Sequence, residues 1–119
     1  MSKKTYELNW YGSFFITIQL DHKKNIEEIF HEMNNFWADS EDRLNAYDGN
    51  VIHVGIKLIA DKAFCLIAEG CFGIEHLKSK FEAEEGYCHI DGSSGIEIID
   101  YYWSGLDDSV ITITEVNYE

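Results

Sequence analysis

Apolar residues recur with two different periods along this chain, and the change of period constrains the fold more than any other feature. Near both ends they alternate with polar residues, which is typical of half-buried β-strands. In the middle of the chain they recur at helical spacing. The alternating segments predict four strands, at Thr5–Trp10, Ser13–Leu20, Ile96–Trp103 and Ser109–Tyr118.

Three segments with helical spacing lie between the two pairs of strands. Ile26–Trp37 carries the clearest apolar stripe and predicts a helix, and Ile74–Glu82 predicts a shorter one. Val51–Glu69 is ambiguous, because its apolar residues fit helical spacing but also alternate at its beginning. Its length, with Ala, Lys and Asp after Leu58, favours one largely buried helix. The alternative is a strand at Val51–Ile59 followed by a helix.

This order of elements, ββ-αα(α)-ββ, predicts an α+β fold. We expect an antiparallel sheet of about four strands with the helices packed on one face, in a single domain spanning residues 1–119. Asp39–Asn50, after the first helix, is polar and turn-rich. The only arginine, Arg43, lies in that segment and is expected to pair with neighbouring carboxylates, which are those of Asp39, Glu41, Asp42 and Asp48.

The hydropathy, the N-terminal segment and the cysteines predict a cytoplasmic protein that does not contact a membrane. No apolar run reaches the roughly 20 residues that a membrane-spanning helix needs. The basic start Met1–Lys4 leads into a segment that Glu7 and Asn9 interrupt, so a signal-peptide core is not expected. The three cysteines form no C-x-x-C pair and are predicted to be reduced thiols.

Negative charge is concentrated at the end of the chain. The formal net charge is −13, and the segment Phe81–Glu119 contains ten acidic residues with no lysine or arginine. Such a field repels phosphate backbones and anionic lipids and attracts basic surfaces. It therefore predicts a basic protein partner and no direct binding of nucleic acid. The plainer interpretation is that the charge only keeps the protein soluble.

No residue pattern in the chain matches a catalytic or metal-binding motif. The Asp91–Gly95 segment lacks the lysine and the length of a phosphate-binding loop, so it is predicted to be a turn. No nucleophile elbow supports a Cys-His-Asp system built on Cys88 and Asp91. We predict no cofactor, no metal and no catalytic residue. The side chains considered as zinc ligands lack the usual short paired spacings, and they are Cys65, Cys71, His76, Cys88 and His89.

Aromatic residues near the two predicted hairpin turns are the strongest candidates for a binding site. Tyrosine and tryptophan are enriched at binding hot spots because they bury a large area with few rotatable bonds. Carboxylates beside them suit a partner rich in lysine and arginine. Alternation along a strand places Tyr102 on the opposite face from its two neighbours. The predicted partner-binding residues are Tyr11, Tyr101, Trp103, Asp107 and Asp108.

Three pieces of the chain resemble a family of small uncharacterised proteins encoded by bacteriophages and prophages. They are Asn35-Phe36-Trp37 followed by Arg43-Leu44, the apolar helix Val51–Ala68, and Glu85-Gly86-Tyr87 leading to Asp91-Gly92-Ser93-Ser94-Gly95-Ile96. The resemblance implies a mobile-element context, in which small acidic proteins often bind and block host proteins. It implies no catalytic residue, because the family has no assigned activity.

These observations lead to one principal hypothesis and two alternatives. The principal one is a non-catalytic acidic protein that binds and inhibits a basic, nucleic-acid-binding type of protein, as a counter-defence or immunity-type factor. One alternative is a small-ligand-binding domain or small enzyme with a pocket between helices and sheet. The other is a structural subunit of a phage assembly. The pocket of the first alternative would be lined by His53, Asp61, Cys65 or His76.

Overall fold

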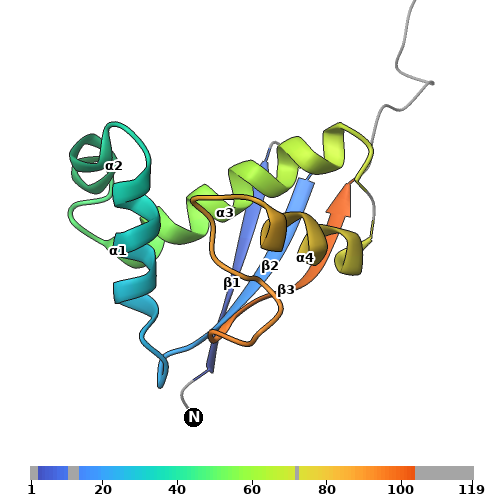
Figure 1. Cartoon of the computed structure of the whole chain (residues 1–119), viewed down its shortest axis with the longest axis horizontal. Coiled ribbons are helices and arrows are strands. Elements are labelled where there is room, and N and C mark those ends of the chain that lie inside the picture. Colours follow the sequence, from blue (N-terminus) through green and yellow to red (C-terminus); the bar gives the residue numbers. More distant parts are fainter. Residues whose placement is uncertain (1–2, 11–13, 72, 104–119) are drawn as a thin grey trace, which may run out of the picture.

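The computed structural model describes residues 3–10, 14–71 and 73–103, without the side chains of Trp10 and Trp103. Within them an antiparallel sheet carries four helices, which confirms the α+β class (Figure 1). The predicted fourth strand, Ser109–Tyr118, lies outside these residues. The elements are β1 (Lys3–Trp10), β2 (Phe14–Asp21), α1 (Ile26–Phe36), α2 (Ser40–Ala46), α3 (Val51–Ala68), α4 (Ile74–Ala83) and β3 (Ile96–Trp103).

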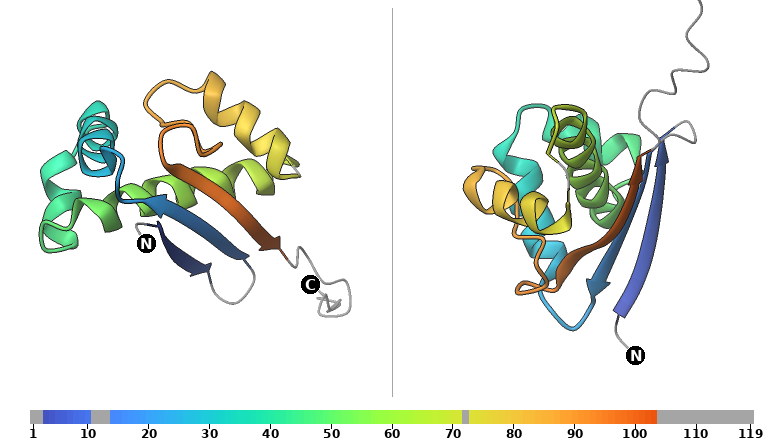
Figure 2. Two further views of the ribbon diagram at one scale, coloured as in Figure 1. Left: turned by 90° about the horizontal axis from the view of Figure 1, so that it is seen from below. Right: turned by 90° about the vertical axis from the view of Figure 1, so that its right-hand side faces the viewer.

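The sheet has the strand order β1-β2-β3, with antiparallel pairing on both sides of the central strand β2. Every second residue of β2, from Phe14 to Leu20, is at most 3% exposed, as its alternation predicts. The helices lie on the face that these side chains occupy, and Figure 2 shows them together on one side of the sheet. The predicted layering of helices on one face is therefore confirmed.

A β-bulge in β3 changes which side chains face the helices. Ile98 pairs with Ile18 and Asp100 pairs with the adjacent residue Thr17, so Ile99 is the extra residue in β3. The bulge reverses the alternation after Ile98. Tyr101 consequently packs against the core and Tyr102 is 57% exposed.

The long apolar segment forms one helix, α3, and this resolves the ambiguity at Val51–Ile59 in favour of the helix. Asn50 caps its first turn by accepting a hydrogen bond from the His53 amide at 3.2 Å. Gly55 lets α1 pack closely, because a Cβ atom there would overlap the Phe30 ring. Helices α1 and α3 therefore form the main helical contact above the sheet.

One expectation for the region after α1 is corrected, and the end of that helix shows an unexpected exposure. The segment expected to be turn-rich, Asp39–Asn50, contains the short helix α2. The apolar stripe of α1 does not remain buried to its end: Phe36 is 53% exposed and Trp37, which follows the helix, is 36% exposed. A stripe is buried only as far as another element covers it, and these two rings pack on Gly86 and on each other. Among the described residues no helix has the length and apolarity needed to cross a membrane.

Candidate functional site

Three aromatic side chains from distant parts of the sequence form a continuous surface at the end of α1. The Trp37 ring lies 4.9 Å from the Phe36 ring and 5.4 Å from the Tyr87 ring, measured between centroids. The Trp37 indole Nε1–H donates a hydrogen bond of 3.1 Å to the Gly86 carbonyl oxygen. We call Phe36, Trp37 and Tyr87 the aromatic corner. It rests on the core, because the Tyr87 ring also packs edge-to-face on the buried Phe81 ring at 5.6 Å.

Gly86 allows the rings to pack directly on the backbone of the segment after α4. Its φ is +85°, in the region that favours glycine. A Cβ atom at this position would overlap the Phe36 ring and would lie 2.7 Å from the Trp37 ring. The position therefore needs glycine for both its backbone conformation and its close contacts.

Arg43, on α2, fixes the backbone that carries Trp37. Its guanidinium donates hydrogen bonds to the Asn34 carbonyl oxygen at 2.9 Å, to the Trp37 carbonyl oxygen at 3.0 Å and to the Ala38 carbonyl oxygen. Its Nε also donates to Oδ1 of the fully buried Asn34 at 2.6 Å. These contacts satisfy carbonyl groups that the end of α1 leaves without helical partners.

The expected pairing of Arg43 with carboxylates is wrong. Within the described residues the four neighbouring acidic side chains form no ion pair with it. The carboxylates are exposed, whereas the guanidinium turns towards the carbonyl groups at the end of α1. Five donors in a planar fork suit such a cluster of acceptors.

Two of the three fragments that carry the family resemblance meet at this corner. Phe36-Trp37 supplies two rings, Arg43 holds their backbone, and Gly86-Tyr87 supplies the carbonyl acceptor and the third ring. Sequence reasoning did not place these residues together, because no local pattern links segments almost fifty residues apart. The only available signal was that the same short fragments stood out in the resemblance.

A shallow groove of about 190 Å³ lies beside the aromatic corner. Burial raises the pKa of the Cys88 thiol to about 12, so this thiol is protonated at neutral pH. Burial also raises the pKa of Tyr87, although the nearby Lys62 opposes the shift. Apart from the Glu32 carboxylate the groove thus offers apolar, uncharged groups, and its lining residues are Ile29, Glu32, Met33, Phe36, Gly86, Tyr87 and Cys88.

Carboxylates lie around the corner and along the segment that follows it. Glu84 pairs with Lys62 at 3.4 Å, and Glu97 pairs with Lys78 at the same distance. The other four described carboxylates of the acidic segment 81–119 are exposed and form no ion pair among the described residues: Glu82, Glu85, Asp91 and Asp100.

The described residues include only two of the five predicted partner-binding residues. The Tyr101 hydroxyl accepts a hydrogen bond from the Gly73 amide at 2.7 Å, and its ring is half-buried against the core. This differs from the expected outward orientation, and the bulge at Ile99 is the reason. Trp103 is described only by its backbone, which pairs with Phe14. Tyr11, Asp107 and Asp108 lie outside the described residues.

The cysteine and histidine side chains considered as zinc ligands, all of which are described, do not converge on one common site. Cys65 is exposed, Cys71 is buried and Cys88 is half-buried, and all three thiols are free. Among the described residues the only group with converging ligand atoms joins His89 to Glu82 and Asp91. Sequence reasoning missed this group because two of its members are carboxylates.

A separate recess of about 400 Å³ lies between β1 and α3. Asp61 and Cys65 line it, as the pocket hypothesis expects, whereas His53 and His76 do not. Lys57 binds the Asp61 carboxylate at 2.6 Å. The recess is mostly apolar, with Leu8, Ala60, Phe64 and Ala68 among its lining residues.

Comparisons with known proteins identify relatives but no activity. The chain is 33% identical over 114 residues to the protein ea10 of Escherichia phage lambda, covering 92% of this chain and 91% of the relative. It has the same identity and coverage with the lambda prophage-derived protein ea10 of Escherichia coli O6:H1 strain CFT073. No solved structure matches the chain.

These relatives confirm the resemblance to small phage and prophage proteins. The model of one family, described as a protein of unknown function, DUF2528, matches residues 15–117. The match includes α1 to α4 and all three fragments that the resemblance rested on. The chain is therefore a member of the DUF2528 family.

Proposed function

We propose that this chain is a non-catalytic protein that binds and inhibits a basic protein partner in the host cytoplasm, as a counter-defence or immunity-type factor. The observation that supports this most is the aromatic corner. Phe36 is 53% exposed and Trp37 is 36% exposed, yet the Trp37 ring and backbone are held by Gly86 and Arg43. Large side chains that are already ordered bind with little further loss of conformational entropy.

Charge around the corner supports a basic partner. Glu32 lines the groove and Glu85 precedes Gly86, and both are exposed. The chain as a whole carries a net charge of −13. Carboxylates around an aromatic centre favour lysine and arginine at the edge of the partner surface and speed association. The same charge disfavours direct contact with nucleic acid. Tyr11, Trp103, Asp107 and Asp108 remain proposed contacts of this acidic surface.

The test is affinity purification of the tagged chain from Escherichia coli lysate, chosen because the relatives come from an Escherichia phage and prophage. We expect a basic protein to bind at about 50 mM salt and to be largely lost at about 300 mM, because salt screens exposed charges. Trp37→Ala should weaken binding by about thirtyfold or more, the size of a hot-spot truncation. The activity of the purified partner should fall when the wild-type chain is added.

Tyr102→Ala is the matched control, because it removes an aromatic ring that is 57% exposed on the sheet. It should leave binding unchanged. A partner lost equally with both variants would contradict the role of the aromatic corner. A partner retained at high salt would contradict the electrostatic part of the proposal.

The recess between β1 and α3 supports a second candidate function, the binding of a small apolar ligand. Its volume is in the range of small-molecule sites, and its lining is predominantly apolar. Native mass spectrometry of the chain purified from the host would reveal a retained ligand. Replacing Ala60 with Leu should fill the recess and abolish retention; a ligand retained equally by this variant would contradict binding there.

A further inference from the structure

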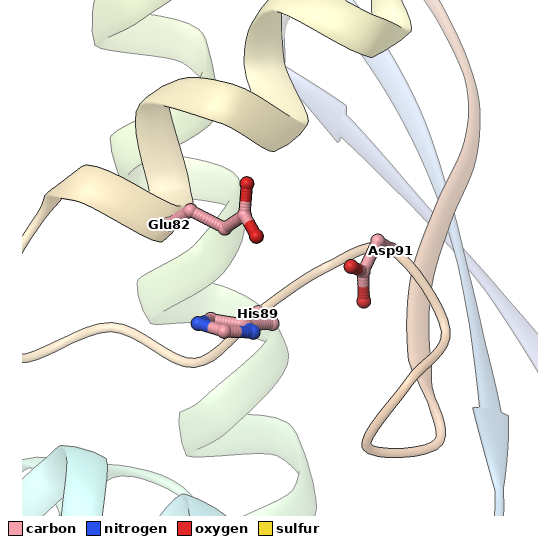
Figure 3. Close-up of side chains that lie close together, drawn as sticks. All are labelled: Glu82, His89 and Asp91. Carbon is pink, nitrogen blue, oxygen red and sulfur yellow. The ribbon is translucent and has the colours of Figure 1, made fainter.

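Three side chains with ligand atoms for a metal ion converge beside the end of α4. Glu82 lies in the last turn of that helix, and His89 and Asp91 lie on the segment that leads to β3. The two residues on the segment are two positions apart and share one side of it, while Ile90 between them is fully buried. Figure 3 shows the Glu82 and Asp91 carboxylates and the His89 ring around one open space.

The geometry of the group is close to that of a metal site. One ligand atom from each of the three residues lies within 4.8 Å of the others. Around a zinc ion with bonds of about 2.0–2.2 Å, neighbouring ligand atoms are roughly 3.3 Å apart. Closing the group requires side-chain movements on the order of 1 Å, which exposed side chains make by small rotations. No backbone change is needed.

The segment that carries His89 and Asp91 is held in place on both sides. The Ile98 amide donates to the Ile90 carbonyl oxygen at 3.2 Å, and the Gly92 amide donates to the Ile96 carbonyl oxygen at 2.9 Å. Oδ1 of Asp91 accepts hydrogen bonds from the Ser93 amide at 2.9 Å and from the Ser93 hydroxyl at 2.6 Å. These bonds orient the carboxylate and leave its second oxygen available to a metal, as outer-shell partners do in metal sites.

No cation of the described chain neutralises the group. The lysines paired with carboxylates near the group, Lys62 with Glu84 and Lys78 with Glu75 and Glu97, bind carboxylates outside it. The side chains of Glu82 and His89 form no hydrogen bond or ion pair with a lysine or arginine of the described residues. Two carboxylates and an imidazole nitrogen are thus grouped without a lysine or arginine partner, and this ligand set suits a divalent cation.

We propose that Glu82, His89 and Asp91 bind a divalent transition-metal ion, with Zn²⁺ as the probe. Imidazole with carboxylate is a ligand set for first-row transition metals, whereas Ca²⁺ takes six to eight oxygen ligands. Three protein ligands leave a fourth position of a tetrahedral zinc ion open to water. The ion would link α4 to the segment before β3.

The test is isothermal titration of the full chain with Zn²⁺ and, separately, with Ca²⁺. We expect Zn²⁺ to bind with one ion at this site and Ca²⁺ not to bind there. His89→Ala and Glu82→Gln should each weaken Zn²⁺ binding at this site by at least about tenfold. Both residues are exposed, so the variants should fold as the wild type does. His76→Ala, which removes another exposed histidine from α4, should leave the site unchanged.

A second measurement locates the ion without any substitution. Paramagnetic Mn²⁺ or Co²⁺ added to ¹⁵N-labelled wild-type chain should perturb first the amide signals of residues 82 and 89–91. Bound Co²⁺ should also show no thiolate charge-transfer band, because no cysteine belongs to the group. Signals perturbed first elsewhere, or Zn²⁺ affinity equal in wild type and His89→Ala, would overturn the proposal.

Discussion

The apolar stripe of α1 is buried at the beginning of the helix and exposed at its end. At its beginning Ile26 and Phe30 are at most 2% exposed, and Phe30 packs against Gly55 of α3. At its end Phe36 and Trp37 are exposed and pack on Gly86 and Tyr87. The first end is held by burial in the core. The second is held by specific hydrogen bonds, so it forms an ordered surface instead of a core.

The largest difference between the two ends should appear when their phenylalanines are truncated. Phe30→Ala should lower the free energy of unfolding by about 3–5 kcal/mol, because it leaves a cavity between α1 and α3. Phe36→Ala should lower it by less than about 1 kcal/mol, because that ring already contacts water. Urea denaturation of both variants measures the difference. Equal losses would mean that the two ends do not differ as described.

Removing the hydrogen bonds to the end of α1 should affect the corner with little effect on the core. Arg43→Lys cannot reproduce the planar arrangement of donors, and it leaves the buried Oδ1 of Asn34 without its hydrogen bond. We expect a loss of about 1–3 kcal/mol in the free energy of unfolding. Amide exchange should become faster at residues 34–38 and stay unchanged in α3. Exchange that rises equally in α3 would show that Arg43 supports the whole fold instead.

Gly86→Ala tests the aromatic corner at the backbone on which its rings pack. A methyl group there meets the Phe36 and Trp37 rings and forces an unfavourable φ. The cost should be about 1–2 kcal/mol in the free energy of unfolding. The indole Nε1–H signal of Trp37 should shift in ¹⁵N–¹H spectra because its bond to Gly86 is displaced. An unchanged signal would contradict the contact.

The smallest effect is expected from the surface ion pair of α3. Lys57 and Asp61 are four residues apart on the exposed side of that helix, with side chains about half exposed. A double-mutant cycle with Lys57→Met and Asp61→Asn should give a coupling free energy of about 0.3–0.5 kcal/mol, lower at high salt. A coupling above the cost of Arg43→Lys would contradict the distinction between surface pairs and the bonds at the corner.

The sequence was informative where one local period decides the structure. Alternation predicted the strand at Ser13–Leu20, and helical spacing predicted the helices at Val51–Glu69 and Ile74–Glu82. It was misleading where a single inserted residue, or a contact between distant segments, determines which side chains face the core. The bulge at Ile99 reverses which tyrosine of β3 faces the core, and no alternation pattern contains that information.

Local sequence patterns could not predict the aromatic corner either, because its residues come together only through tertiary contacts. The Trp37 indole and the Gly86 carbonyl oxygen meet only after α1, α3 and α4 have packed. Arg43 was expected to pair with its acidic neighbours in sequence, but it binds carbonyl groups that exist as free acceptors only once α1 ends. Both contacts are consequences of tertiary structure.

The most direct test of the aromatic corner is a nuclear Overhauser measurement on the wild-type chain. If the corner is built as described, the Trp37 indole Nε1–H will show cross-peaks to the Gly86 Hα protons and to the Tyr87 ring. Cross-peaks only within Trp37 and to its neighbours in sequence would show that the rings do not meet, and the proposed binding surface would have no structural basis.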